Sequence, residues 1–396
     1  MKESVDKYKA SPEEKLKEKM MAGVNKCLSN LNEEFFPTNS SKEKRRSKHD
    51  DSSKFDPSSA NTMEIVGNIK VGQKVPDSSA RHIMVVTTWR SGSTFLGDLL
   101  NHYKGVFYYY EPLLYYEMSY LNNKNPPQSE IEFIESLLKC RYDKDNIGYF
   151  HHISSDLLSL HNFRLRNSCH HLLPQEKMCL FPEYLNKVCP LYPIKLMKTV
   201  RLDLRETETL IKDPSLNLKI LFLVRDPRGT YNSRSDTEIS RWCEDRKQCV
   251  NLELGCEQMM DNINAAFDLE TRYPGTIKLV RYEDLSMNPH DVVTDMMDFL
   301  DLPMIEELNN YIVTHTGAEK QKNNRYGTYR NSTARASAWR DKMSFDRIKE
   351  IQNACRAPMS KLGYRLLHNP EETKNRNLKP LASNLKTIWP FELNQN

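Results

Sequence analysis

The stretch WRSGSTF, from Trp89 to Phe95, combines an arginine, a glycine and three hydroxyl side chains. It follows the short β-branched run Ile83–Thr87 and precedes apolar residues at helical spacing, so we expect a turn between a buried strand and a helix. Such a turn presents unpaired N–H groups at the positive end of the helix dipole, where phosphate or sulfate binds. Gly92 lets the backbone approach the anion. The added hydroxyl donors are Ser91, Ser93 and Thr94.

The nucleotide-binding pattern GxxxxGK[ST] is missing, because Arg90 stands where such loops carry lysine. This absence disfavours ATP or GTP chemistry of the P-loop kind. On this turn alone, an N-capped helix with an exposed arginine is favoured equally, since short Ser/Gly motifs often arise by chance.

A second turn of the same kind follows the apolar run Lys219–Val224. In it, Arg225 and Ser233 stand eight residues apart and flank the sequence DPRGTYN. If a first helical turn brings them together, the guanidinium can grip a phosphate bidentately and the hydroxyl can complete the contact. Two anion-binding turns after two neighbouring strands imply a ligand with phosphate at both ends.

The elements that must hold these turns alternate between strand and helix. The other expected elements are strands at Val106–Tyr110 and Thr276–Leu285 and helices at Leu252–Arg272, Pro289–Leu300 and Phe345–Cys355, the last with Ser344 as N-cap. This alternation predicts an α/β domain with a central parallel sheet flanked by helices.

Composition divides the 396-residue chain into three parts. Residues 1–80 are rich in Lys, Glu and Ser and are expected to form a disordered charged arm, in which the apolar positions of Lys15–Leu31 are too sparse for a core face. The domain is expected at residues 81–368 and a loose tail at 369–396. The net charge of +4 gives no indication of nucleic acid binding. No run of 18 apolar residues is present, so neither a transmembrane helix nor a signal peptide is expected.

The combination of TTWRSGSTFLGDLL with LVRDPRGTYNSR resembles the paired 5′-phosphosulfate and 3′-phosphate motifs of the sulfotransferases. More narrowly, the chain resembles the Golgi carbohydrate 6-O-sulfotransferases that act on galactose, N-acetylgalactosamine or N-acetylglucosamine. The resemblance continues through GVFYYYEPL and LVRYEDL to about residue 368. It implies a single P-loop-like sulfotransferase domain, 3′-phosphoadenosine 5′-phosphosulfate as the donor, a glycan as the acceptor, and no metal.

The resemblance also implies roles for individual residues. Arg90 to Phe95 would hold the 5′-phosphosulfate, and Arg225 with Ser233 the 3′-phosphate. Arg90 would stabilise the negative charge that builds on the bridging oxygen as the sulfuryl group leaves. Glu111, just beyond the aromatic strand, is the candidate general base, and we expect desolvation to raise its pKa. The segment Arg330–Arg340 matches the family's C-terminal donor-binding region only loosely.

Several other functions are compatible with these motifs. One is a small-molecule sulfotransferase, because the insert Asn122–Leu196 leaves the acceptor open. Another is a catalytically dead glycan-binding protein of the same fold, although the joint retention of Arg90, Glu111, Arg225 and Ser233 argues against it. A nucleoside-phosphate kinase is opposed by the missing lysine and by the lack of a magnesium-binding carboxylate after a strand.

The cysteines bear on location. Cys243, Cys249 and Cys256 suggest a disulfide cluster, whereas in the cytosol they would be buried thiols. We therefore expect the Golgi lumen or membrane, by resemblance, with the cytoplasm as the alternative because no anchor is found in this chain. The sequence leaves open whether the protein forms a homodimer. His151, His152, Cys169, His170, His171, Cys179 and Cys189 fit no common zinc spacing. Trp339 is expected in the core, and Asp284 is expected to pair near Arg281.

Overall fold

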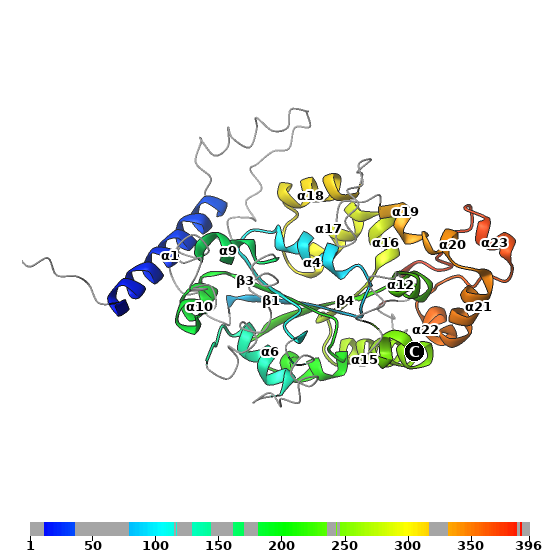
Figure 1. The fold of residues 1–396 in the computed structure, drawn as a ribbon, viewed down its shortest axis with the longest axis horizontal. Coiled ribbons are helices and arrows are strands. Elements are labelled where there is room, and N and C mark those ends of the chain that lie inside the picture. Colours follow the sequence, from blue (N-terminus) through cyan, green and yellow to red (C-terminus); the bar gives the residue numbers. More distant parts are fainter. Residues whose placement is uncertain are drawn as a thin grey trace, which may run out of the picture. The chain divides into compact units, whose positions relative to one another are not determined.

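The computed structural model of the protein describes residues 12–35, 79–114, 116, 129–143, 161–169, 181–235, 243, 246–316, 332–385 and 389. The strands form one five-stranded sheet in the order β2-β3-β1-β4-β5 (Figure 1). Their bounds are β1 Arg81–Thr87, β2 Val106–Tyr110, β3 Ile194–Thr199, β4 Asn217–Val224 and β5 Ile277–Arg281.

The helices before β4 are α1 Pro12–Phe35, α4 Ser93–Asn101, α6 Glu130–Leu138, α9 Phe163–Cys169, α10 Pro182–Val188, η3 Cys189–Leu191, η4 Leu204–Thr207 and α11 Glu208–Ile211. Those after β4 are α12 Pro227–Arg234, α14 Lys247–Val250, α15 Leu252–Arg272, α16 Tyr282–Met287, α17 Pro289–Phe299, α18 Glu306–Thr316, α19 Ser332–Ala336, α20 Trp339–Lys342, α21 Phe345–Ala354, α22 Arg356–Lys361 and α23 Pro370–Lys374. The expected helix boundaries at α15, α17 and α21 are confirmed to within a residue. Ser344 caps α21 by accepting from the Arg347 N–H at 3.3 Å.

The predicted parallel sheet with flanking helices is confirmed. β4 pairs in parallel with β1, from Arg81 opposite Asn217 to Thr87 opposite Leu223, and also with β5. The carboxyl ends of these strands therefore share one edge of the sheet, where ligands of open α/β folds bind.

Two details of the sheet differ from expectation. β5 is shorter than the predicted strand, because the chain turns into α16 at Tyr282 and Arg281 pairs with Asp284 at 2.6 Å. β3 was not expected at all, since Lys195 and Lys198 interrupt its apolar run, although both are almost fully buried.

The chain divides into two compact units. Unit 1 comprises residues 1–80, 104–109 and 115–194, and unit 2 comprises residues 81–103, 110–114 and 195–396. In unit 2, helices α4 and α17 lie on one side of the strands and α15 lies on the other (Figure 1). The domain boundaries expected after residues 80 and 368 stay predictions.

Unit 1 corrects the expectation for Lys15–Leu31. Helix α1 buries one face through Met20, Val24, Cys27 and Leu31, which recur at helical spacing. At its end, the Glu34 carboxylate accepts from Arg164 of α9 at 2.7 Å and from the Gly105 N–H at 3.0 Å. The four apolar positions are therefore enough for a core face, because each lies about one helical turn from the next.

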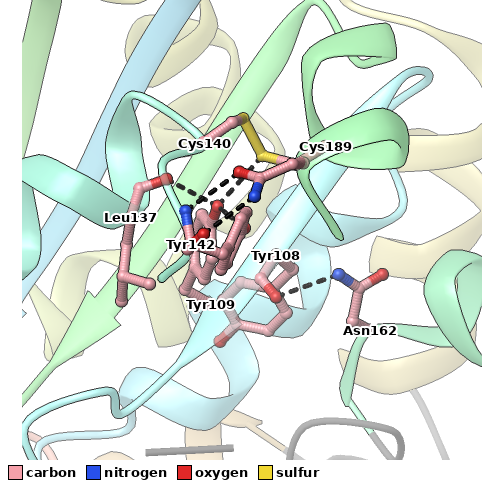
Figure 2. The surroundings of a disulfide bond; sticks show 8 residues. Tyr108, Tyr109, Leu137, Cys140, Tyr142, Asn162 and Cys189 are labelled. Atoms are coloured by element: carbon pink, nitrogen blue, oxygen red, sulfur yellow. Dashed lines mark hydrogen bonds between the residues drawn. A yellow bond between two sulfur atoms is a disulfide. The ribbon is translucent and has the colours of Figure 1, made fainter. Parts of the chain in front are cut away.

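A disulfide between Cys140 and Cys189 forms a second feature of unit 1 (Figure 2). The Tyr109 hydroxyl lies beside it, 3.1 Å from the Cys189 sulfur and 2.5 Å from the Tyr142 hydroxyl. The run Phe107–Tyr109 is fully buried, as expected for strand positions.

The histidines and cysteines that fit no zinc spacing divide into disulfide-bonded cysteines and residues outside the described ranges. Cys169 and Cys189 are both disulfide-bonded and so are not free thiolates. His151, His152, His170, His171 and Cys179 lie outside the described residues.

In unit 2, Cys243 pairs with Cys249 as the cluster suggested, and Cys256 pairs with Cys355, 99 residues away. Part of the C-terminal tail is held by Arg340, which donates to the Asn375 and Leu378 carbonyls at 2.9 and 2.8 Å. Most residues from 370 to 385 are exposed. The loose tail expected at 369–396 stays a prediction.

Candidate active site

The first predicted turn lies between β1 and α4. Arg90 and Gly92 both have left-handed backbone conformations, with φ of 70° and 94°. Gly92 is the N-cap of α4, and its carbonyl accepts from the Phe95 N–H at 3.1 Å. A Cβ at this glycine would lie 2.4 Å from the Tyr282 ring, so both conformation and space favour glycine. The turn leaves the first N–H groups of α4 without helical acceptors, as an anion site requires.

The hydroxyl groups of this turn have different surroundings. The Ser91 hydroxyl is buried and lies 2.7 Å from the Thr87 hydroxyl, which donates to the Leu223 carbonyl of β4 at 2.5 Å. Thr94 is partly exposed, and its hydroxyl lies 3.4 Å from the Tyr110 hydroxyl. In this arrangement the Ser91 hydroxyl is engaged with Thr87, and its role as a donor to the anion stays a prediction.

Ser93 and Phe95 complete the predicted phosphosulfate loop. Ser93 is buried in the first turn of α4. Phe95 is half-buried, and its ring centroid lies 5.8 Å from that of Tyr311 on α18. The Phe95 ring therefore belongs to an aromatic contact at the start of α4.

The second predicted turn, between β4 and α12, meets the first. Asp226 caps α12 by accepting from the Arg228 N–H at 2.9 Å. Arg225 Nη1 donates to the Arg90 carbonyl at 2.8 Å, and Arg90 Nε donates to Ser233 Oγ at 3.0 Å. Arg90 thus contacts both residues that the sequence placed in the second turn. The expectation that the two turns are neighbours is confirmed.

Tyr282 was not predicted as a site residue. It directly follows β5, and its ring lies against Gly92 and 4.5 Å from the Arg225 guanidinium. The signal that could have found it is positional, because Tyr282 follows its strand as Arg225 follows β4. Tyr282 therefore supports both turns from the end of a third strand.

Glu111 lies at the end of β2 with a left-handed backbone, φ 47°. Its N–H donates to the Lys198 carbonyl of β3 at 2.8 Å. Its carboxylate forms ion pairs with Lys198 Nζ and with Arg201 Nη1, and its side chain is 15% exposed. Lys198 and Arg201 were missed by sequence reasoning, although a lysine inside an apolar run was a usable signal.

The two cations decide the ionisation of Glu111. Burial raises the pKa of the carboxyl, but the charges and hydrogen bonds of Lys198 and Arg201 outweigh it and lower the pKa to about 2. The expectation of a raised pKa is therefore wrong, because it considered the aromatic strand and not the cations on and just after β3.

The Glu111 cluster adjoins the first turn through aromatic rings. The Lys198 ammonium lies 4.2 Å from the Tyr110 ring, and the Arg201 guanidinium lies 5.6 Å from the Trp89 ring. Trp89 immediately precedes Arg90, and Tyr110 contacts Thr94. A carboxylate, two cations and an anion-type turn therefore lie along the same edge.

Comparison with known proteins gives the family of the chain. The sulfotransferase domain family matches residues 80–363. Carbohydrate sulfotransferase 1 of Mus musculus is 30% identical over 339 residues, which cover 75% of this chain and 82% of the mouse protein. The Homo sapiens protein of the same name matches with the same identity and coverage. The chain belongs to the carbohydrate sulfotransferase family. A solved sulfotransferase domain from the curacin biosynthetic pathway is 17% identical with a TM-score of 0.41, and covers 73% of this chain and 99% of that domain.

Behind the second turn, the sulfotransferase has a buried polar framework. Arg228 pairs with Asp226 at 2.7 Å and donates to Gln352 at 2.8 Å, and neither charged side chain is exposed. The Arg228 guanidinium lies 4.2 Å from the Trp339 ring. Trp339 is 1% exposed and packs with Ile348 and Leu367, so its expected place in the core is confirmed.

The loosely matching segment Arg330–Arg340 is described from Ser332 onward. Arg340 is buried, and its guanidinium donates to carbonyls of the C-terminal segment. In this arrangement Arg340 holds the tail of the sulfotransferase. Among the helices that the structure describes, none has the length and apolar character needed to cross a membrane.

Proposed function

We propose that this carbohydrate sulfotransferase moves a sulfuryl group from 3′-phosphoadenosine 5′-phosphosulfate to the 6-hydroxyl of N-acetylglucosamine, galactose or N-acetylgalactosamine in a glycan. The observation that best supports this donor is that two anion-type turns meet at Arg90, which contacts both Ser233 and Arg225. A donor with phosphate groups on both sides of its ribose needs two such turns close together.

The proposed roles follow from position and charge. Arg90 and the N–H groups at the start of α4 bind the 5′-phosphosulfate, while Arg225 and Ser233 bind the 3′-phosphate. As the sulfur–oxygen bond to the phosphate breaks, negative charge builds on the bridging oxygen. Arg90 is always protonated, so it stabilises that charge by attraction and hydrogen bonding and does not donate a proton.

Glu111 is the proposed general base. The sugar oxygen attacks sulfur, the bond to the donor phosphate breaks, and the hydroxyl proton passes to the Glu111 carboxylate. Because its pKa is about 2, this carboxylate is ionised throughout the physiological range but weakly basic. It therefore takes the proton late, when the forming oxygen–sulfur bond has made the hydroxyl acidic. Lys198 and Arg201 hold the carboxylate in place through their ion pairs.

Transfer of labelled sulfate to glycans, phenols and steroids tests this function. We expect incorporation into glycans with a terminal N-acetylglucosamine, galactose or N-acetylgalactosamine, at O6, and no loss of activity with a divalent-metal chelator. Labelling of phenols or steroids alone would establish a small-molecule sulfotransferase. Glycan binding without transfer would establish a dead binding protein.

We further propose maturation in the Golgi lumen. The disulfides Cys140–Cys189, Cys243–Cys249 and Cys256–Cys355 support an oxidising compartment. Non-reducing mass mapping of protein from its native cells is expected to recover these pairs. Free thiols at all six positions would favour the cytoplasm instead.

A further inference from the structure

Glu283, in the first turn of α16, is a fully buried carboxylate behind the second turn. Its Oε1 accepts from the Asp226 N–H at 3.1 Å, and its Oε2 accepts from the Tyr364 hydroxyl at 2.9 Å. Both partners are neutral donors. Among the described residues, no cation lies within ion-pair distance of this carboxylate. A buried carboxylate without a paired cation is costly and invites a functional explanation.

Its neighbours make the position unusual. Asp226 is a second fully buried carboxylate, and its cation, Arg228, already binds both of its oxygens. Arg225 is a cation whose charge acts on Glu283, yet its Nη1 is engaged with the Arg90 carbonyl. The Arg225 Nε is buried and has no hydrogen-bond partner among the residues that the structure describes.

We propose that Glu283 is a positioning residue of the 3′-phosphate turn. It fixes the peptide between Arg225 and Asp226, and it takes up a proton when a phosphate binds at Arg225. This inference rests on the proposed assignment of Arg225 to the 3′-phosphate. Donor binding and protonation of a buried carboxyl are then coupled.

The charges around Glu283 give the sign of the coupling. Burial and the Asp226 charge raise the pKa of Glu283 to about 7, against the opposing effects of Arg225 and of the two hydrogen bonds. A phosphate at Arg225 adds negative charge nearby and competes for the Arg225 charge, so it raises the proton affinity of Glu283 further. The other charges that face this region are Arg228, paired with Asp226, and Arg281, paired with Asp284.

Protonation keeps both contacts of Glu283, with the direction of the Tyr364 hydrogen bond reversed. A neutral carboxyl group still accepts from the Asp226 N–H through its carbonyl oxygen and donates to the Tyr364 hydroxyl through its OH. Loss of the negative charge also removes repulsion between the carboxylate and the incoming phosphate. Relative to Glu283→Gln, the affinity of the wild type for the bisphosphate product is therefore expected to fall as the pH rises from 6 to 8.

Calorimetry with 3′-phosphoadenosine 5′-phosphate at pH 7, in two buffers of different ionisation enthalpy, measures this proton. The wild-type protein is expected to take up more proton than Glu283→Gln, by up to about half a proton, since a group with a pKa of about 7 is half ionised there. The phosphates of the ligand contribute the same proton exchange with the wild type and with Glu283→Gln. The difference in proton uptake between the two proteins therefore reports on Glu283. Glu350→Gln removes an exposed carboxylate on α21 and is expected to match the wild type.

Equal proton uptake in the wild type and Glu283→Gln would overturn the inference. Failure of the wild type to bind the bisphosphate would instead contradict the proposed function. Tyr364→Phe serves if Glu283→Gln does not fold, because it removes one hydrogen bond to the carboxylate. In Tyr364→Phe, the pH at which proton uptake is greatest is expected to be higher than in the wild type. The same pH of greatest uptake in both proteins would count against the coupling.

Discussion

Two glutamates shielded from solvent, Glu111 after β2 and Glu283 in the first turn of α16, differ in the sign of the charges around them. Glu111 faces Lys198 and Arg201, whereas Glu283 lies beside the carboxylate of Asp226. Burial raises the pKa of both. The neighbours then lower the pKa of Glu111 to about 2 and help to raise that of Glu283 to about 7.

The difference separates two tasks within one site. Glu111 is ionised whenever the enzyme works, as a group that must accept a proton during turnover has to be. Glu283 is close to half ionised at neutral pH, as a group that exchanges a proton on binding has to be. Burial alone therefore does not predict the role of a carboxylate, and the sign of the nearest charges does.

The largest expected effect comes from Arg90→Ala, which removes the cation shared by both turns. We expect kcat/KM to fall by about 10³-fold, because removal of one transition-state donor typically costs 10²- to 10³-fold and donor binding weakens as well. Steady-state kinetics with varied donor separate the two contributions. A loss confined to KM would show that Arg90 only binds the donor.

Arg225→Ala tests the 3′-phosphate turn alone. Hydrogen bonds to charged groups contribute about 1.5–3 kcal/mol, so the Kd for 3′-phosphoadenosine 5′-phosphate is expected to rise about 10- to 150-fold. Arg347→Ala is the matched control, since Arg347 is exposed and pairs with Glu350 on α21. Unchanged affinity in Arg225→Ala would remove the assignment.

Thermal unfolding against pH sharpens the comparison of the two glutamates. The folded pKa of Glu283 lies above its unfolded value, so wild-type stability falls as the pH rises from about 4.5 to about 7. The Tm of Glu283→Gln relative to wild type should therefore rise across this window, by about 2–4 °C for each kcal/mol. A constant difference in Tm would mean that the proton affinity of Glu283 is ordinary.

For Glu111, we expect the opposite dependence of stability on pH. Its folded pKa lies below its unfolded value, so its stabilisation is present above about pH 4.5 and is lost as the pH falls towards 2. Glu111→Gln should be less stable than wild type at pH 6, and the gap should narrow by pH 3. A difference in stability between Glu111→Gln and the wild type that does not change with pH would show that the ion pairs of Glu111 contribute nothing to stability.

Local patterns explain what could be predicted from the sequence. Each turn directly follows an apolar strand and opens a helix, so Arg90, Gly92, Arg225 and Ser233 could be found within short windows. Ser344 could be assigned as an N-cap for the same reason. Such features depend on residues only a few positions apart.

Long-range contacts explain what could not be predicted. The partners of Glu111 stand 87 and 90 residues away, on and just after β3, a strand whose apolar pattern is interrupted by two lysines. Glu283 acquires its environment from Asp226 and Tyr364, which lie 57 and 81 residues away. The pKa of a buried group is set by neighbours that folding brings together, and no local window contains them.

The central claim is that Glu111 takes the proton of the acceptor hydroxyl, and Glu111→Gln tests it most directly. The substitution keeps the size of the side chain and removes the basic carboxylate. With the best glycan acceptor, kcat is expected to fall by about 10²-fold or more, while the Kd for 3′-phosphoadenosine 5′-phosphate stays within about twofold of wild type. A wild-type kcat in Glu111→Gln would contradict the account, because another group would then have to accept the proton.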